Sequence, residues 1–406
     1  MKKLYQIIHL VLCMTIAMLF TTSCSNDLPE PNEKLQGNTV IIYMGAENSL
    51  SYHDDYTEAF SKKDIDEMIW AAPQIPEDCQ VVVFKDDDLN PVILRINKKG
   101  KTTWKQYEQE LNSGDPATMK SILSDITKSF PSNKYSLILW SHGSGWIDAN
   151  NSRAIIVDNQ KNSTSNKGSW INISDLSDIL STLPHMEYIM FDACYMQSVE
   201  VAAELYPYAD YIIGSPTEIP GNGAPYNLIM KALCKADVPG IIDGYASGYP
   251  SGNGVLLSAI SSDDFTVFCL ETAKYIGQAF NKSNKLSVAG IQIYAPAYGN
   301  TYGKQDEMPV PYDMRSAMHR VLSNEDYTAW ESIWRRTVLY PTKANNWDTI
   351  YSSGVYGMFH CTMIDSEHYG GISMNIPDTK YDSKGWNTEF KQTAWYRLAN
   401  WEQTGW

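Results

Sequence analysis

The sequence predicts an α/β protein with a mainly parallel sheet, helices on both faces of that sheet and a C-terminal elaboration. Short, uninterrupted apolar runs, such as residues 39–44 and 188–191, alternate with longer segments whose apolar residues fall on one helical face. Strands of a parallel sheet have this composition because helices cover both of their faces. At 406 residues with 43% hydrophobic content, the chain can bury a sizeable core.

Five buried strands are expected along the first half of the chain, at residues 39–44, 79–84, 136–140, 188–191 and 211–214. Residues 92–96 follow a polar turn and are expected to form a hairpin with the second strand. Residues 154–157 are expected to form a short extra strand.

Helices are expected between these strands, at residues 62–72, 116–130, 174–180 and 197–205. The second helix is marked most clearly, because Asp115 suits the N-cap, Pro116 suits the first helical position and Pro131 ends the segment.

The pattern becomes less regular after residue 220. Helices are expected at 263–280 and 314–337, and strands at 289–295 and 370–376, the last of which should return to the sheet. No repeat period is visible. We therefore predict one domain over residues 38–406, in which 240–370 forms the less regular elaboration.

The N-terminus is typical of an exported protein. Two lysines precede an apolar run at residues 7–20, and small residues follow, which predicts a signal peptide over 1–23. Cys24 comes next and suits lipidation, although no leucine lies three residues before it; an ordinary signal peptide with an incidental cysteine is the alternative. Residues 24–37 would form a flexible tether. The expected location is the cell envelope of a Gram-negative bacterium, lipid-anchored at the outer membrane or cell surface.

The formal net charge of −15 argues against nucleic-acid binding, because the chain would repel phosphates. Five cysteines remain once Cys13 leaves with the signal peptide and Cys24 carries lipid: Cys79, Cys194, Cys234, Cys269 and Cys361. The number is odd and no CxxC spacing occurs, so we expect neither a disulfide framework nor a zinc site.

No metal or other cofactor is predicted. His360, Cys361 and His368 are close in sequence but lack the spacing of a metal-ligand motif. The acidic run at 86–88 (Asp86, Asp87 and Asp88) could bind calcium, but it lacks EF-hand spacing and is typical of a turn.

Two of the predicted strands end in chemically active residues. The run SLILW leads into Ser141, His142 and Gly143, and YIMF leads into Asp192, Ala193 and Cys194. Carboxyl ends of parallel strands meet at one edge, so neighbouring strands would place His142 beside Cys194. This pair suits a thiol nucleophile with a histidine base. The imidazole and a following helix N-terminus should lower the thiol pKa, and the backbone N–H groups of Gly143 and Cys194 could form an oxyanion hole.

These stretches resemble the clostripain family of cysteine peptidases, which have the caspase-like fold. The resemblance is carried by TVIIYMGAENSL, YSLILWSHGSGW, YIMFDACYMQSVEVAAEL, YIIGSPTEIPGNGAPY, GISMNIP and TAWYRLANWEQTGW. It spans roughly residues 38–406 and is weakest over 240–370. It implies that His142 is the base and Cys194 the nucleophile.

The resemblance also implies a specificity for Arg or Lys before the scissile bond. Asp192 would lie in the specificity pocket and pair with the basic side chain; the alternative is that it supports the turn after the strand. Glu218 could line the same pocket or be an ordinary loop carboxylate.

Such peptidases are often made as zymogens that are cut in a loop after the histidine strand. Lys161 and Lys167 lie in a polar, basic stretch here and are candidate cleavage sites, together with the less accessible Arg153. The alternative is an ordinary surface loop.

We therefore predict a monomeric cysteine endopeptidase that acts on protein or peptide substrates after Arg or Lys and contacts the membrane through its lipid. The alternatives are a non-catalytic surface lipoprotein that uses the fold as a binding module, and a glycan-handling lipoprotein that uses its many aromatic residues.

Overall fold

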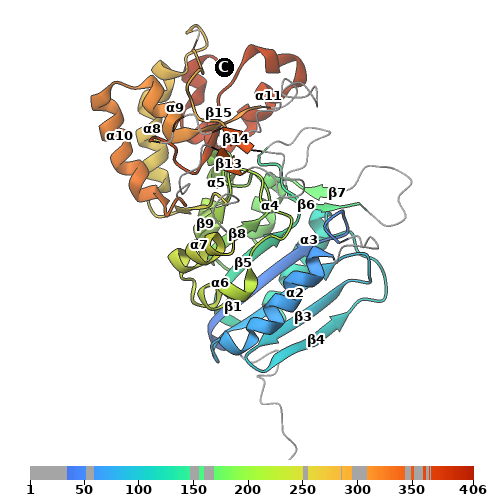
Figure 1. Cartoon of the computed structure of the whole chain (residues 1–406). Helices are drawn as coiled ribbons and strands as arrows, with labels where there is room; N and C mark the ends of the chain where they lie inside the picture. The colour runs from blue at the N-terminus through green and yellow to red at the C-terminus, as the bar shows by residue number, and fades with distance from the viewer. Residues whose placement is uncertain are drawn as a thin grey trace, which may run out of the picture.

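The computed structural model describes residues 34–51, 59–146, 155–159, 169–249, 255–284, 286–294, 309–342, 349–351, 360–362, 365 and 367–406. Within them, one mixed sheet has the spatial order β12 (Val338–Leu339), β10 (Ser258–Ser261), β9 (Ala209–Gly214), β8 (Met186–Asp192), β5 (Ser132–Trp140), β1 (Leu35–Gly45), β2 (Gln80–Asp86), β3 (Val92–Asn97) and β4 (Gly100–Gln106). Figure 1 shows this sheet crossing the lower part of the molecule.

The five central strands of the sheet are parallel, as the sequence predicts. β1 pairs in parallel with both β2 and β5, and β8 pairs in parallel with β5 and β9. Both flanks are antiparallel: β2, β3 and β4 form a meander on one side, and β10 and β12 follow β9 on the other. The predicted hairpin at 92–96 is confirmed by the pairing of β2 with β3.

Helices cover both faces of the sheet. One face carries α2 (Phe60–Ala71), α6 (Tyr226–Lys235) and α7 (Val238–Ser247), and the other carries α3 (Pro116–Ser129), α4 (Ile173–Leu180) and α5 (Val199–Leu205). Alternate residues of β1 serve the two cores: Val40 and Ile42 belong to the first, and Ile41 and Tyr43 to the second. This two-sided burial explains the uninterrupted apolar runs.

The predicted start of α3 is confirmed. The Asp115 side chain accepts a hydrogen bond of 2.8 Å from the backbone N–H of Thr118, and Pro116 occupies the first turn. This cap satisfies one of the N–H groups that have no partner within the helix.

The C-terminal elaboration gathers at one end of the sheet (Figure 1). It contains α8 (Phe265–Ala279), α9 (Met314–Val321), α10 (Asn324–Thr337), α11 (Trp386–Gln392) and α12 (Ala394–Leu398). Buried aromatic residues join these helices: Phe268 stacks on Trp395 with ring centroids 6.3 Å apart, and Phe280 contacts Trp401 at 5.3 Å. Several of the aromatic residues that the sequence offered as a glycan-binding face are therefore core residues.

Short elements complete the described chain. They are the pairs β6 (Ile155–Asp158) with β7 (Ser169–Ile171), β11 (Pro311–Asp313) with β15 (Ser373–Asn375), and β13 (Thr349–Tyr351) with β14 (His360–Thr362), and the 3-10 helices η1 (Ala72–Gln74), η2 (Tyr206–Tyr208), η3 (Thr379–Lys384) and η4 (Trp401–Thr404). β6 confirms the predicted short extra strand.

Three predictions for the C-terminal part are wrong. The helix expected at 314–337 is two helices, because Ser323 leaves the helical conformation and accepts a bond from the N–H of Asp326 to begin α10. Residues 370–376 do not return to the main sheet, since β15 pairs with β11. In the described part of 289–295, the only bridge is that of Ile293 with Tyr312, so the expected strand is not formed.

The predicted N-terminal segments lie mostly outside the described residues, including the whole signal peptide and Cys24. The tether expected at 24–37 extends too far, because β1 already begins at Leu35. No helix in the described ranges has the length and apolar character that a membrane span requires.

Candidate active site

The pairing of β5 with β8 places the two candidate catalytic residues at the same sheet edge. Trp140, the last residue of β5, lies opposite Asp192, the last residue of β8. The pairing continues one step further, since the N–H of Ser141 donates to the carbonyl of Asp192 over 3.4 Å. His142 and Cys194 therefore follow two adjacent strands as they leave the sheet, as the sequence predicts.

Ser141 holds the backbone just before His142 in place. Its hydroxyl donates to the carbonyl of Gly45 at the end of β1 over 2.7 Å, and it accepts a bond of 3.0 Å from the N–H of Val157 in β6. The Asn48 amide adds bonds to the carbonyls of Gly45 and Val157. The end of β5 is thus fixed to the end of β1 and to β6, which limits where His142 can lie.

His142 is partly buried, and its Nε2 atom lies 2.9 Å from the hydroxyl of Ser49. Ser49 comes from the loop after β1, at the same edge of the sheet. Ser49 and Asn48 are not among the site residues that the sequence predicts. The signal was available, because the polar stretch GAENSL follows a buried parallel strand.

Gly143 allows the histidine turn to approach the cysteine turn. A Cβ atom at this position would lie 2.7 Å from the Cys194 carbonyl oxygen and 3.0 Å from both Ala193 Cβ and Met196 Sδ. Any larger residue would push these two turns apart. Gly143 also bridges to Ile155 of β6.

The turn that carries Cys194 is strained and held from one side. Tyr195 has a φ of 62°, a conformation that costs a non-glycine residue about 1–3 kcal/mol. The N–H groups of Tyr195 and Gln197 donate to the carbonyls of Thr217 and Ser215, over 2.9 and 3.0 Å. The loop after β9 therefore supports the turn in which Cys194 lies.

The Cys194 thiol is protonated at neutral pH in this arrangement, contrary to the expectation of a lowered pKa. Burial, together with the smaller effect of the negative charges of Glu218 and Asp192, raises the pKa of Cys194 to about 12. The N–H of Ile219, which lies 3.4 Å from Sγ, opposes these effects by donating to the sulfur. Glu218 accordingly lies close enough to influence the thiol.

Asp192 is buried and accepts three hydrogen bonds. The hydroxyls of Tyr226 and Tyr245 and the N–H of Ala224 each donate to its carboxylate over 3.0 Å. Burial raises the pKa of Asp192 to about 6 despite these donors. A Cβ on Gly223 would lie 2.9 Å from Asp192 Oδ2, so the glycine lets the chain close over the carboxylate.

A second buried carboxylate accompanies Asp192. Asp64 of α2 accepts a bond of 2.6 Å from the indole N–H of Trp140. Burial and the charge of Asp192 raise the pKa of Asp64 well above its ordinary value. In the described part of the chain, no ion pair includes Asp64 or Asp192. Asp64 is not among the predicted site residues, because no sequence motif marks its position on α2.

The acidic run at 86–88 divides between two roles. Asp87 accepts a bond of 3.1 Å from the N–H of Leu89 and pairs with Lys85, as expected for a turn. Asp86 instead lies with Glu47 and Glu110, with one oxygen of each within 4.8 Å of the others. Burial raises the pKa of Asp86 to about 9. Carboxylate oxygens suit calcium, so these three residues could hold such an ion.

The three candidate cleavage sites, Arg153, Lys161 and Lys167, lie outside the described residues. The described chain stops at residue 146, resumes for 155–159 and resumes again at 169. Each candidate is therefore in one of two segments that flank β6.

Comparison with known proteins identifies relatives of this chain. A sequence profile of the clostripain family matches residues 42–406. Clostripain from Hathewaya histolytica is 25% identical over 252 residues, which are 52% of this chain and 47% of that protein, so the match spans about half the length of this relative.

Solved structures show the same fold over most of the chain. A secreted C11 cysteine protease from Bacteroides thetaiotaomicron, solved with an irreversible peptide inhibitor, is 28% identical with a TM-score of 0.74, and the match covers 90% of this chain and 99% of that one. An inactive zymogen C11 protease from Parabacteroides distasonis is 24% identical with a TM-score of 0.71, covering 90% and 98%. These likenesses confirm the predicted α/β, caspase-like fold.

The protonated thiol has a measurable consequence. The test uses protein whose intact mass shows that the chain is uncut. At pH 8, iodoacetamide should label Cys194 more slowly, by a factor on the order of 10³, than it labels a thiol with an ordinary pKa near 8.5. Glu218→Gln removes a charge that raises the thiol pKa and should speed the labelling, whereas the exposed control Glu402→Gln should not. Peptide mapping after timed labelling gives the rates. Equal rates in wild type and Glu218→Gln would contradict this electrostatic account.

Proposed function

Because this chain belongs to the clostripain family of cysteine peptidases, we propose that it is an endopeptidase that uses Cys194 as nucleophile and His142 as base. The observation that carries the proposal is the register of β5 with β8, in which Trp140 lies opposite Asp192. This register supports the dyad because it brings both residues to one edge.

The proposed reaction proceeds through an acyl-enzyme. His142 takes the thiol proton while Cys194 Sγ attacks the peptide carbonyl carbon, and the backbone N–H groups of Gly143 and Cys194 stabilise the resulting oxyanion. His142 then protonates the leaving amine as the C–N bond breaks. Water hydrolyses the thioester with His142 again acting as base. Ser49, bonded to Nε2 in this structure, would orient the imidazole.

We further propose that the enzyme cleaves after Arg or Lys. Asp192 and Asp64 are buried carboxylates, and Glu218 lies near the thiol. A guanidinium or ammonium group would offset the electrostatic cost of burying these groups, and a carboxylate pairs well with a guanidinium. The tyrosine hydroxyls that bond Asp192 would keep the carboxylate in position while it receives the basic side chain.

The described state is proposed to be a precursor that is activated by cleavage at Lys161, Lys167 or Arg153. A thiol with a pKa near 12 is a poor nucleophile, which supports a need for activation. The three basic residues flank β6, and β6 contacts both Gly143 and Ser141. A cut beside β6 would therefore release a strand that holds the histidine turn.

Export and lipid anchoring through Cys24 are also proposals. The relative from Bacteroides thetaiotaomicron with 28% identity is described as secreted, which supports export. Lipid attachment and a monomeric state rest on the sequence alone. Calcium held by Glu47, Asp86 and Glu110 would neutralise an acidic cluster near the end of β2, in which Glu47 and Asp86 are buried and Glu110 is exposed, and no step above depends on it.

A non-catalytic binding module is the second candidate function. The raised pKa of Cys194 favours it, because a thiol that stays protonated after loop cleavage would not attack a peptide bond.

Replacement of either dyad residue tests the mechanism. In loop-cleaved protein, Cys194→Ala should leave no hydrolysis of fluorogenic Arg or Lys peptides above background, and His142→Ala should lower kcat/KM by about 10²–10⁴-fold, because its general base is lost. Cys269→Ala and His185→Ala are controls that alter a cysteine and a histidine elsewhere. Unchanged hydrolysis by Cys194→Ala would refute the mechanism, whereas a lack of hydrolysis by loop-cleaved wild-type protein would favour the binding module.

The specificity proposal predicts a loss that depends on substrate charge. Asp192→Asn should lower kcat/KM for Arg peptides by about 10- to 100-fold, since a charge-assisted bond is lost, and should weaken discrimination between Arg and the neutral isostere citrulline. Asp210→Asn, at an exposed position, is the control. Comparison of the two substrates within each variant separates specificity from folding. If Asp192→Asn retains the wild-type ratio of Arg to citrulline hydrolysis, Asp192 does not select the basic side chain.

Intact mass reports the proposed processing. Wild-type protein on incubation should give fragments ending at Lys161, Lys167 or Arg153, while Cys194→Ala should stay whole until active enzyme is added, because the cut needs the thiol. A variant with all three basic residues changed to Gln should remain uncut and weakly active. Full activity of a chain whose mass is unchanged would show that cleavage is not needed.

A further inference from the structure

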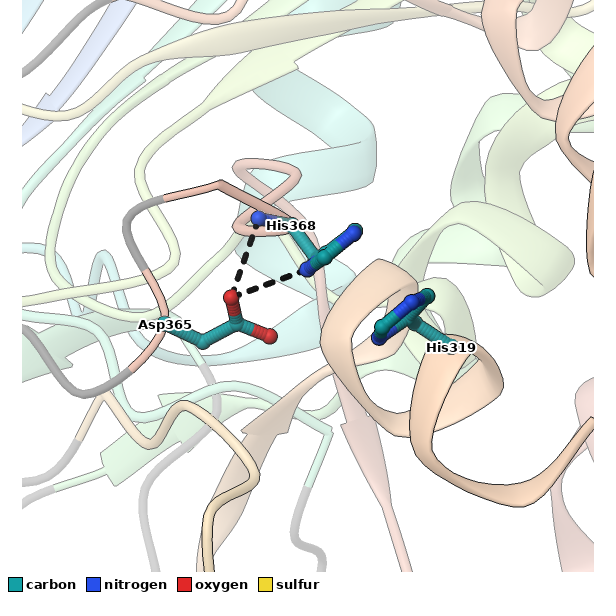
Figure 2. Close-up of side chains that lie close together, drawn as sticks. All are labelled: His319, Asp365 and His368. Carbon is teal, nitrogen blue, oxygen red and sulfur yellow. Dashed lines mark hydrogen bonds and ion pairs between the residues drawn. The ribbon is translucent and has the colours of Figure 1, made fainter. Parts of the chain in front are cut away.

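A second group of chemically active side chains lies in the C-terminal elaboration, apart from the candidate active-site residues. His319 comes from the last turn of α9, and Asp365 and His368 come from the segment between β14 and β15. Figure 2 shows the three side chains facing one another. One nitrogen or oxygen atom of each lies within 4.8 Å of the others, and all three residues are partly exposed.

Hydrogen bonds fix the orientation of Asp365. Its Oδ1 lies 3.0 Å from His368 Nδ1 and accepts a bond of 3.1 Å from the His368 N–H, as the dashed lines in Figure 2 show. Its Oδ2 accepts a bond of 2.8 Å from the hydroxyl of Ser316, and its own N–H donates to Gln292 Oε1 over 3.1 Å. The carboxylate is thus held from two sides.

The backbone around His368 is also fixed. The Arg315 guanidinium donates to the carbonyls of Glu367 and Tyr369, over 3.0 and 3.4 Å. Arg315 is itself paired with Glu331 of α10. Because Arg315 belongs to α9, it ties the segment that carries His368 to the helix that carries His319.

The two imidazoles lie face to face. The ring centroids of His319 and His368 are 3.4 Å apart with an angle of 11° between their planes, and the edge of Tyr327 contacts both rings. The nitrogen of a neutral imidazole has a lone pair with which it can bind a metal.

We propose that His319, Asp365 and His368 bind a zinc ion. Two imidazoles and one carboxylate are a common zinc ligand set, in which a water completes a tetrahedral site. The ion would replace the proton between Asp365 Oδ1 and His368 Nδ1, and the bond from Ser316 to Asp365 Oδ2 would remain as an outer-shell support.

Binding requires a rotation of the His319 ring. A metal ion lies in the plane of each imidazole ring that binds it. Two stacked, parallel rings have no shared plane, so they cannot bind the same ion in their present orientation. His319 is partly exposed on the last turn of α9, so its ring can turn an edge towards Asp365. In a tetrahedral site, zinc bonds of about 2.0–2.2 Å place the ligand atoms ~3.4 Å apart, so the three atoms, which now lie within 4.8 Å of one another, would draw together as the ring turns.

The bound ion would connect α9 to the segment that leads into β15. It would therefore stabilise the folded C-terminal elaboration, by the linkage that applies to any ligand of the native state. Because imidazoles must be unprotonated to bind a metal, affinity should fall as the pH is lowered.

The test uses full-length, tag-free protein with Cys194→Ala, so that the active-site thiol cannot bind metal. Co²⁺ titration should give one equivalent with d–d absorption, which Zn²⁺ displaces. His319→Ala and His368→Ala should each lose affinity by more than the about 10- to 100-fold typical of outer-shell changes. His185→Ala is the matched control, because His185 forms a surface pair with Asp210 at 2.9 Å.

Thermal unfolding gives a second readout that separates binding from folding. Zn²⁺ should raise the Tm of the parent and of His185→Ala, and should leave the Tm of His319→Ala and His368→Ala at their metal-free values. The inference is overturned if the parent binds no Zn²⁺ at micromolar concentration. It is equally overturned if His319→Ala and His368→Ala bind Co²⁺ and gain stability as the parent does.

Discussion

The parallel pairing of β5 with β8 is the constraint on which the candidate active site depends. With Trp140 opposite Asp192, the two strands end together, so the residues that follow them leave the sheet at the same edge. A slip of one residue would reverse which side chains face each core, so burial on both faces of the sheet stabilises this register. Ser141 and Gly143 then bring the histidine turn against the cysteine turn.

Local signals in the sequence predicted the sheet core, the cap of α3 and the positions of His142 and Cys194. These features depend on runs of neighbouring residues, which a single sequence displays directly. The partners of these residues could not be predicted in the same way. Tyr226 and Tyr245 reach Asp192 from helices in a region without clear periodicity, and Ser49 reaches His142 from a loop after a different strand.

The errors in the C-terminal elaboration have a related origin. The run at 370–376 has the composition of a buried strand, but its partner β11 lies outside the main sheet, and composition does not specify a partner. The His319, Asp365 and His368 cluster was missed because its members are joined by the packing of α9 against a distant segment. Spacing rules detect metal sites only when the ligands are close in sequence.

The acidic residues around Cys194 would link the proposed selectivity to the reactivity of the thiol. Glu218 and Asp192 raise the pKa of the thiol through their negative charge. A cation placed against these carboxylates offsets the same field and so moves the thiol towards its ionised form. A positively charged ligand therefore acts on the nucleophile as well as on the carboxylates. In such a site, the acidic groups keep the thiol protonated only while no positive charge lies against them.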